Sequence, residues 1–172
     1  MRKAIVSVIA IGLVGCSPAS ITPDPQPSAG ADVGSVGATS ESATSGIVTR
    51  TSRHSVAETM ARLEAAVTAK GLTVFAKVDH AANAKTAGQA LPPTMLLIFG
   101  NPQLDTSLMR AAPTVALDLP QRVAVYGTPS GEVRVSYNDP EWLAARHGVT
   151  GQDAELAKIS AALAAFVAAA TN

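Results

Sequence analysis

The chain has 172 residues, which is long enough for one domain with a hydrophobic core once non-globular segments are set aside. Its 13 basic and 13 acidic residues cancel, and only 3% of its residues are aromatic. The chain therefore lacks the positive charge and the stacking rings that nucleic-acid binding requires, so no nucleic-acid partner is expected. Cys16 is the only cysteine, which excludes a disulfide, a thiol nucleophile or a cysteine metal site in the remainder of the chain.

The first fifteen residues have the pattern of a signal peptide. Arg2 and Lys3 precede an apolar run, 4–15, that is too short to span about 30 Å of hydrocarbon. The run ends in Leu13-Val14-Gly15-Cys16, which resembles the bacterial lipobox. The resemblance implies cleavage before Cys16 and attachment of lipid, including palmitate, to that residue. The alternative is an ordinary secretory signal with an incidental cysteine.

Lipid on Cys16 would anchor the chain to a membrane, which is the partner that the sequence predicts. The protein would then lie in the bacterial cell envelope and face the periplasm. Ser17 follows the cysteine, which resembles the pattern of lipoproteins sorted to the outer membrane. Residues 16–45 are rich in Pro, Ser and Gly and show no helical or strand periodicity. They are predicted to form a disordered tether, followed by one domain over 46–172.

The first half of this domain begins with a predicted strand over 46–53. Ser55 and Glu58 match a capping box, and apolar residues at helical spacing then continue to Lys70-Gly71, where a glycine ends the helix. Residues 72–79 alternate as a strand with Val74, Ala76 and Val78 on one face. A short helix or turn and a loop are expected over 80–93.

The apolar run 94–99 predicts a central strand covered on both faces. One helical turn is expected within 110–120. Residues 122–126 and 132–137 alternate as two strands joined by a five-residue hairpin loop. A short helix over 141–147 and a final helix over 153–171 complete the chain.

The final helix raises the alternative of a membrane span. Its large apolar residues, Leu156, Ile159, Leu163 and Phe166, lie on one face, and Glu155 and Lys158 lie in its first turns. A packed helix is therefore favoured over a span. The order of elements predicts a two-layer α+β domain of the β-α-β4-α type, with a mainly antiparallel sheet and helices on one face.

Several blocks of sequence, taken in order, resemble the domain-of-unknown-function family 302 (DUF302) over about 55–149. They are Lys77-Val78-Asp79-His80, 96–102, 108–113, Leu117-Asp118-Leu119-Pro120, 135–140 and Ala145-Arg146-His147-Gly148. The resemblance implies a β-α-β4-α fold and a tendency to form homodimers through the sheet or the helices, and it implies no assigned activity. The chain departs from the family pattern at Asp105 and Ser107, on either side of Thr106.

Polar residues at predicted strand ends form the candidate ligand pocket, provided that these ends converge. The candidates are Asp79, His80, Asn101, Tyr137, Asp139 and His147. His80 and His147, with Asp79 or Asp139, are also weak candidates for metal ligands, because imidazole and carboxylate suit zinc or iron(II). The alternative is structural: Asp79 and His80 end a strand and cap the next segment, and His147 favours a helix C-terminus.

No catalytic residue is identified, since the chain has no Gly-x-Ser-x-Gly elbow, phosphate loop or dinucleotide fingerprint, and no cofactor is expected. The sequence favours a membrane-anchored lipoprotein with a small non-catalytic binding or assembly domain, whose small-molecule ligand is unknown. The alternative is a metal- or small-ligand-dependent enzyme that uses His80, His147 and nearby carboxylates. A third hypothesis is an envelope structural protein with no small ligand.

Overall fold

The computed structural model describes residues 45–172. The predicted signal peptide, its lipidation site Cys16 and almost all of the predicted tether lie outside the described residues. The elements are, in chain order, β1 (Ile47–Ser52), α2 (Val56–Ala69), β2 (Thr73–Asp79), α3 (His80–Thr86), β3 (Thr94–Gly100), α4 (Pro102–Ala111), the 3-10 helix η1 (Pro113–Leu117), β4 (Gln121–Gly127), β5 (Val133–Asn138), α5 (Pro140–His147) and α6 (Asp153–Thr171).

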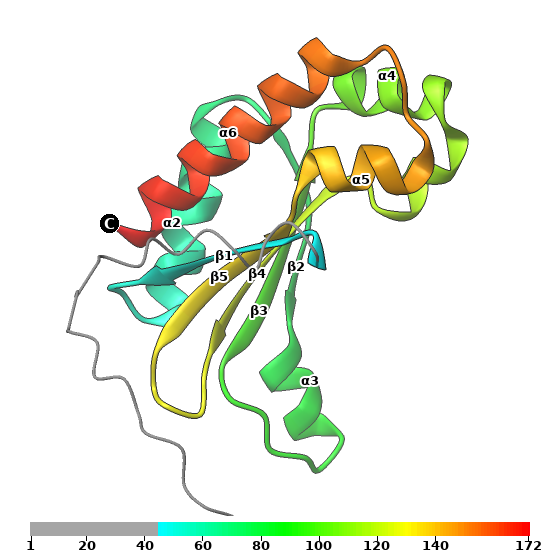
Figure 1. Ribbon diagram of the computed structural model, residues 1–172. Helices are drawn as coiled ribbons and strands as arrows, with labels where there is room; N and C mark the ends of the chain where they lie inside the picture. The colour runs from blue at the N-terminus through cyan, green and yellow to red at the C-terminus, as the bar shows by residue number, and fades with distance from the viewer. Residues whose placement is uncertain (1–44) are drawn as a thin grey trace, which may run out of the picture. The chain divides into compact units, whose positions relative to one another are not determined.

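The five strands form one sheet in the order β1-β5-β4-β3-β2, and every neighbouring pair is antiparallel (Figure 1). α2 connects the two edges, since β1 lies at one edge and β2 at the other. The predicted α+β fold is confirmed, with the β-α-β4-α order as its frame. Three shorter helical segments, α3, α4 with η1, and α5, are added at the ends of the sheet.

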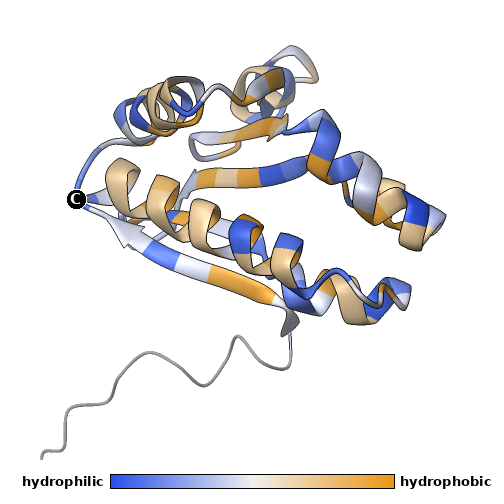
Figure 2. Cartoon of the chain, turned by 90° about the horizontal axis from the view of Figure 1, so that it is seen from above, coloured by the Kyte–Doolittle hydropathy of each residue, from blue (hydrophilic) through white to orange (hydrophobic). Residues whose placement is uncertain are grey.

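α2 and α6 pack against each other and cover the same face of the sheet. Between these helices and the strands lies a core of fully buried apolar side chains: Met60, Leu63, Val67, Leu97, Phe99, Val123, Val125, Val135, Leu163, Phe166 and Val167. Figure 2 shows that hydrophilic residues gather near the N-terminal end of α6, whereas its C-terminal half carries the moderate hydropathy of alanine.

α6 passes the length and hydropathy test for a membrane span. Its large apolar residues nevertheless point into the core, where Leu163 and Phe166 are at most 4% exposed. The ring of Phe166 meets that of Phe99 of β3 edge-on, with centroids 6.0 Å apart. The helix is therefore packed through one apolar face, as its sequence pattern predicts.

The start of α2 confirms one half of the predicted capping box. The Ser55 hydroxyl accepts a hydrogen bond from the Glu58 amide at 3.2 Å. The Glu58 carboxylate lies 3.0 Å from Nδ1 of His54. Glu58 therefore pairs with the histidine that precedes the cap, and the reciprocal half of the box is not formed.

A β-bulge in β2 makes the predicted single apolar face wrong. Val74 pairs with Phe99, whereas Ala76 pairs with Ile98 and Val78 with Leu96, so the register shifts by one residue. Because opposite residues in an antiparallel pair share a face, Val74 points toward the helices, and Ala76 and Val78 point away from them.

β3 is an interior strand, but its two faces are not equally covered. Leu97 and Phe99 are at most 1% exposed beneath α2 and α6, whereas Leu96 and Ile98 on the other face are half-buried. The prediction that both faces are covered is therefore wrong, because both long helices lie on one side. The apolar run alone could not distinguish these arrangements.

α4 is the element that the sequence reading missed. Its start is marked by Asn101, whose side-chain oxygen accepts from the Gln103 amide at 3.0 Å, and by Pro102 at the first helical position. Asparagine at the N-cap followed by proline is a recognised start signal for a helix. In the sequence, Asn101 is interpreted as a polar residue at a strand end and a pocket candidate, and no helix is expected after it.

Replacing Ser55 with alanine should lower the free energy of unfolding by about 1 kcal/mol, because the N-cap bond to Glu58 is lost. Replacing Glu58 with alanine should cost less than about 0.5 kcal/mol, since it removes only a solvent-exposed pair with His54. Urea unfolding monitored by circular dichroism measures both variants. Equal losses would show that Glu58 contributes to the cap after all.

Candidate functional site

The predicted pocket residues lie at opposite ends of the sheet. Asp79 is opposite Met95 at the beginning of β3, and Asn101 follows the end of that strand. Six residues of extended chain separate these positions, a distance of about 20 Å. The register therefore keeps Asp79 and His80 apart from Asn101, and Tyr137 and Asp139 belong to β5 and its end, three positions from β2 in the sheet.

Three of these residues start helices. The carboxylate of Asp79 accepts from the Ala82 amide at 2.9 Å at the N-terminus of α3, and that of Asp139 accepts from the Glu141 amide at 2.8 Å at the N-terminus of α5. Asn101 has the same role in α4. The expectation that Asp79 caps the next segment is confirmed. His80 is the exposed first residue of α3.

His147 is the last residue of α5, and its side chain is 5% exposed. Its Nε2 lies 2.7 Å from the Asp118 carboxylate and its Nδ1 lies 3.1 Å from the Thr114 hydroxyl. Arg146 also donates to Asp118, at 3.0 Å. The cluster joins the end of α5 to η1. Within residues 45–172 there is no group of three His, Cys, Asp or Glu side chains suited to a metal ion.

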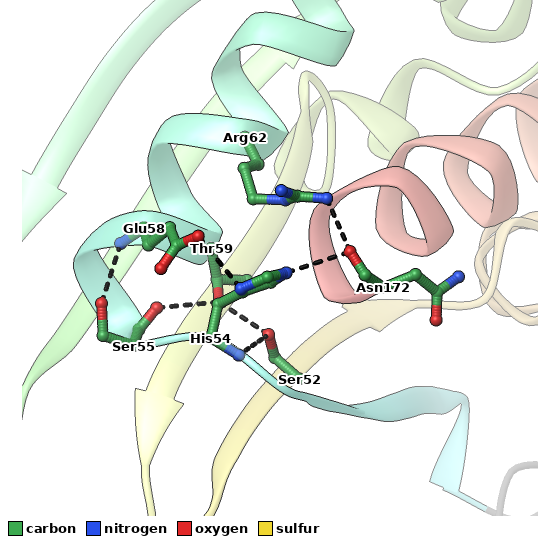
Figure 3. A network of polar contacts seen from close by, with 7 residues as sticks. All are labelled: Ser52, His54, Ser55, Glu58, Thr59, Arg62 and Asn172. Carbon is green, nitrogen blue, oxygen red and sulfur yellow. Dashed lines mark hydrogen bonds and ion pairs between the residues drawn. The ribbon is translucent and has the colours of Figure 1, made fainter.

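His54, the third histidine, belongs to a network that joins the two long helices (Figure 3). Its Nε2 lies 3.0 Å from the main-chain oxygen of Asn172, which also accepts a 2.6 Å hydrogen bond from Arg62 of α2. Beneath them the buried hydroxyls of Ser52 and Thr59 are 2.8 Å apart. These contacts fasten the end of α6 to β1 and α2.

Tyr137 lies on β5 and lines a cavity of about 270 Å³ with Arg50, Thr51 and the C-terminal turns of α6. Burial raises the pKa of its phenol, and Asp139 adds to this effect, while the positive charge of Arg50 opposes it. The phenol therefore remains protonated at neutral pH. The other predicted pocket residues do not line this cavity.

A second cavity, which we call the Asp105 cavity, is lined by two buried polar side chains. It has a volume of about 100 Å³ and lies among β3, β4, α4 and α6. Most of its lining is apolar: Leu72, Phe99, Leu104, Ile159, Ala162, Leu163 and Phe166. Its polar lining residues are Asn101, Asp105, Gln121 and Lys158.

Asp105 and Gln121 are both more than nine-tenths buried, at 6% and 7% exposure. No hydrogen bond to either side chain is found among residues 45–172, but solvent reaches their polar atoms, since the fully buried side-chain polar atom without a partner in this part of the chain is Ser160 Oγ. Burial of the Asp105 carboxyl without an opposite charge still disfavours its ionised form. The cavity thus combines an apolar lining with a carboxyl group and an amide group that are not hydrogen-bonded to other described residues.

Gly100 makes room for the carboxyl group. A Cβ at this position would overlap Oδ2 of Asp105 and press on Pro120 at 3.2 Å. The close approach of the β3 backbone therefore encloses one side of Asp105. Burial raises the pKa of Asp105 from 3.8 to about 6.

Sequence reasoning noted Asp105 as a departure from a pattern but not as a site residue. The missed signal is its position. In α4, Asp105 lies three residues before Leu108, which is 2% exposed, so an acid occupies the apolar face of the helix. This signal becomes visible only once α4 itself is recognised.

Asp105→Asn should stabilise the protein in a pH-dependent way. The folded state holds the Asp105 proton up to about pH 6, so between pH 4 and 6 it binds more protons than the unfolded state. The contribution of Asp105 to the stability of the wild type therefore falls across that window as pH rises, by up to about 3 kcal/mol. The asparagine variant lacks this loss.

The measurement is urea unfolding at pH 4 and pH 7.5. The stability difference between Asp105→Asn and wild type should be larger at pH 7.5 by about 2–3 kcal/mol. Asp153→Asn removes an exposed carboxylate of α6 and is the matched control. A difference that is the same at both pH values would contradict the burial of an ionisable carboxyl.

Comparison with solved structures supports the fold. The crystal structure of the uncharacterised conserved protein DUF302 from Bacillus stearothermophilus is similar with a TM-score of 0.66 over 73% of this chain and 98% of that chain. The two sequences are 21% identical, so this likeness shows the fold alone.

Among curated proteins, the chain is 53% identical over 105 residues to a protein named fluoride-specific ion channel FluC 1 from Brucella suis, and equally to one of the same name from Brucella abortus. The match covers 61% of this chain but only 41% and 39% of those proteins. The chain thus spans about two fifths of the length of the curated relatives it matches.

The family model described as "Domain of unknown function DUF302" matches residues 48–166, from β1 into the last turns of α6. This range includes the sheet, the Asp105 cavity and the His147 cluster. The chain belongs to the DUF302 family.

Proposed function

We propose that this chain is a lipid-anchored envelope protein whose domain binds a small molecule in the Asp105 cavity without transforming it. One observation carries the proposal: Asp105 and Gln121, each more than nine-tenths buried, line an apolar chamber, and neither side chain is hydrogen-bonded to another residue of 45–172. Small-molecule sites typically combine an apolar lining with a few convergent polar groups. A ligand would supply the hydrogen bonds that the fold leaves unmade.

The lining favours binding over catalysis. Of the residues that line the cavity, Asp105 and Lys158 are titratable, and Lys158 is exposed at its rim. Nucleophilic chemistry needs a general base within hydrogen-bond reach of the nucleophile. His80 and His147, the bases of the alternative enzyme hypothesis, do not line this cavity.

The size of the cavity limits the ligand. A cavity of about 150 Å³ holds benzene, whereas sites for drug-sized ligands measure about 300–1,000 Å³. The Asp105 cavity, at about 100 Å³, therefore suits a molecule of about six non-hydrogen atoms or fewer.

Ligand binding is tested by a thermal-shift screen of small polar molecules against the full-length protein, with Ala162→Met as the blocking variant. Ala162 lines the cavity from α6 and is half-buried, so a methionine side chain there should fill the space. Ligands should raise the melting temperature of the wild type and not that of Ala162→Met. Equal shifts in both proteins would place binding elsewhere.

A second candidate function comes from the relatives. Proteins named as fluoride-specific ion channels share the matched segment, so this chain is a candidate accessory domain for fluoride handling. Fluoride needs hydrogen-bond donors, and the Asp105 cavity offers the Gln121 amide. The neighbouring Asp105 carboxylate repels anions above pH 6, so fluoride should bind there only at lower pH. Fluoride is added to the ligand screen for this reason, and ¹⁹F NMR detects its binding directly.

The membrane anchor is proposed from the sequence pattern that ends at Cys16. Full-length protein in the cell should incorporate labelled palmitate and require detergent for extraction, whereas Cys16→Ala should do neither, because several acyl chains contribute about 0.8 kcal/mol per buried methylene. Ser17→Ala is the matched control and should remain anchored. Extraction of the wild type by a detergent-free wash would contradict the anchor.

Sorting to the outer membrane and the homodimer implied by the family resemblance stay predictions.

A further inference from the structure

We infer that the ligand of the Asp105 cavity is a small organic cation, of the alkylammonium class, held by Asp105 and Gln121 against the rings of Phe99 and Phe166. This inference rests on the proposed binding function and specifies its ligand. Four properties of the cavity support it: the hydrogen-bonding character, the charge, the aromatic lining and the size.

The free hydrogen-bonding groups match an ammonium group. An ionised carboxylate only accepts hydrogen bonds, and the oxygen of the glutamine amide accepts as well. Asp105 and Gln121 both line the cavity, and neither side chain is hydrogen-bonded to another described residue. An ammonium group carries N–H donors and no acceptor, so one small group could donate to both the Asp105 carboxylate and the oxygen of the Gln121 amide.

The charge of the lining also favours a cation. Besides Asp105, the only other charged side chain that lines the cavity is Lys158, which α6 contributes. Lys158 is exposed, and the pKa of Asp105 is raised by burial with no opposing effect of a positive charge. The strands contribute no charged side chain to the lining, and the α2–β2 connection contributes only Leu72. Among the described residues the carboxylate is therefore not ion-paired.

Two aromatic rings add to this preference. Phe99 and Phe166 both line the cavity and meet edge-on, at a centroid distance of 6.0 Å. The face of an aromatic ring attracts a cation, and the attraction is larger where water is excluded. The apolar part of an alkylammonium ion would contact the surrounding leucine, isoleucine and alanine side chains, which a hydrated metal ion would not.

The test compares three probes of four non-hydrogen atoms each with the full-length protein by NMR titration: isopropylammonium, isopropanol and acetate. At pH 8 the wild type should bind isopropylammonium at least tenfold more tightly than isopropanol, and acetate should not bind. The resonances that shift should include the side-chain amide of Gln121.

Asp105→Asn keeps the size of the side chain and removes its charge. This variant should lose at least tenfold of its affinity for isopropylammonium and keep its affinity for isopropanol. Asp153→Asn removes the same charge from an exposed position and should behave like the wild type. In the wild type, binding of isopropylammonium should weaken as the pH falls below 6, because the cavity carboxyl becomes protonated.

The outcomes separate the cation inference from the proposed binding function. Equal affinities of the wild type for isopropylammonium and isopropanol would overturn the cation inference and leave the proposed binding function intact. Preferential binding of acetate would also overturn it, in favour of an anion. If none of the three probes binds, the cation inference fails, and the thermal-shift screen with Ala162→Met then decides the proposed binding function separately.

Discussion

The burial of one carboxyl group where β3 passes into α4 is the constraint on which the site depends. Asp105 lies in the first turn of α4, against Gly100 and facing the interior, so its position is set by both elements. Burial of apolar side chains in the core stabilises the folded domain. Burial of the ionised Asp105 carboxylate lowers the free energy of unfolding, because the charge loses part of its hydration. A cation that paired with this carboxylate, as proposed, would offset that cost.

Elements with local signals were predictable from the sequence. The serine cap and the terminal glycine of α2, the alternating strands of the hairpin and the apolar stripe of α6 each depend on residues within one segment. The bulge in β2 and the unequal cover of β3 depend instead on which strands and helices become neighbours. Periodicity within a segment carries no information about that choice.

The candidate site was harder to predict because capping residues and ligand-binding residues are the same residue types. Asp79, Asn101 and Asp139 attracted attention as polar residues at strand ends, and the structure uses each to start a helix. Convergence of strand ends is a property of parallel sheets, whereas this sheet is antiparallel throughout and sends successive strand ends in opposite directions. Asp105 was hidden because its significance depends on α4, which the sequence reading did not identify.

The surroundings of the cavity indicate that it is formed before any ligand arrives. The hydroxyl of Ser107 in α4 donates a 2.8 Å hydrogen bond to the Gln152 side chain, which directly precedes α6. At its other end α6 is held by Arg62 and His54 through the main-chain oxygen of Asn172. Both ends of the helix that forms one wall are thus fixed to neighbouring elements. A ligand that enters a preformed chamber loses little free energy to ordering the protein, so even a molecule with few contacts can bind measurably.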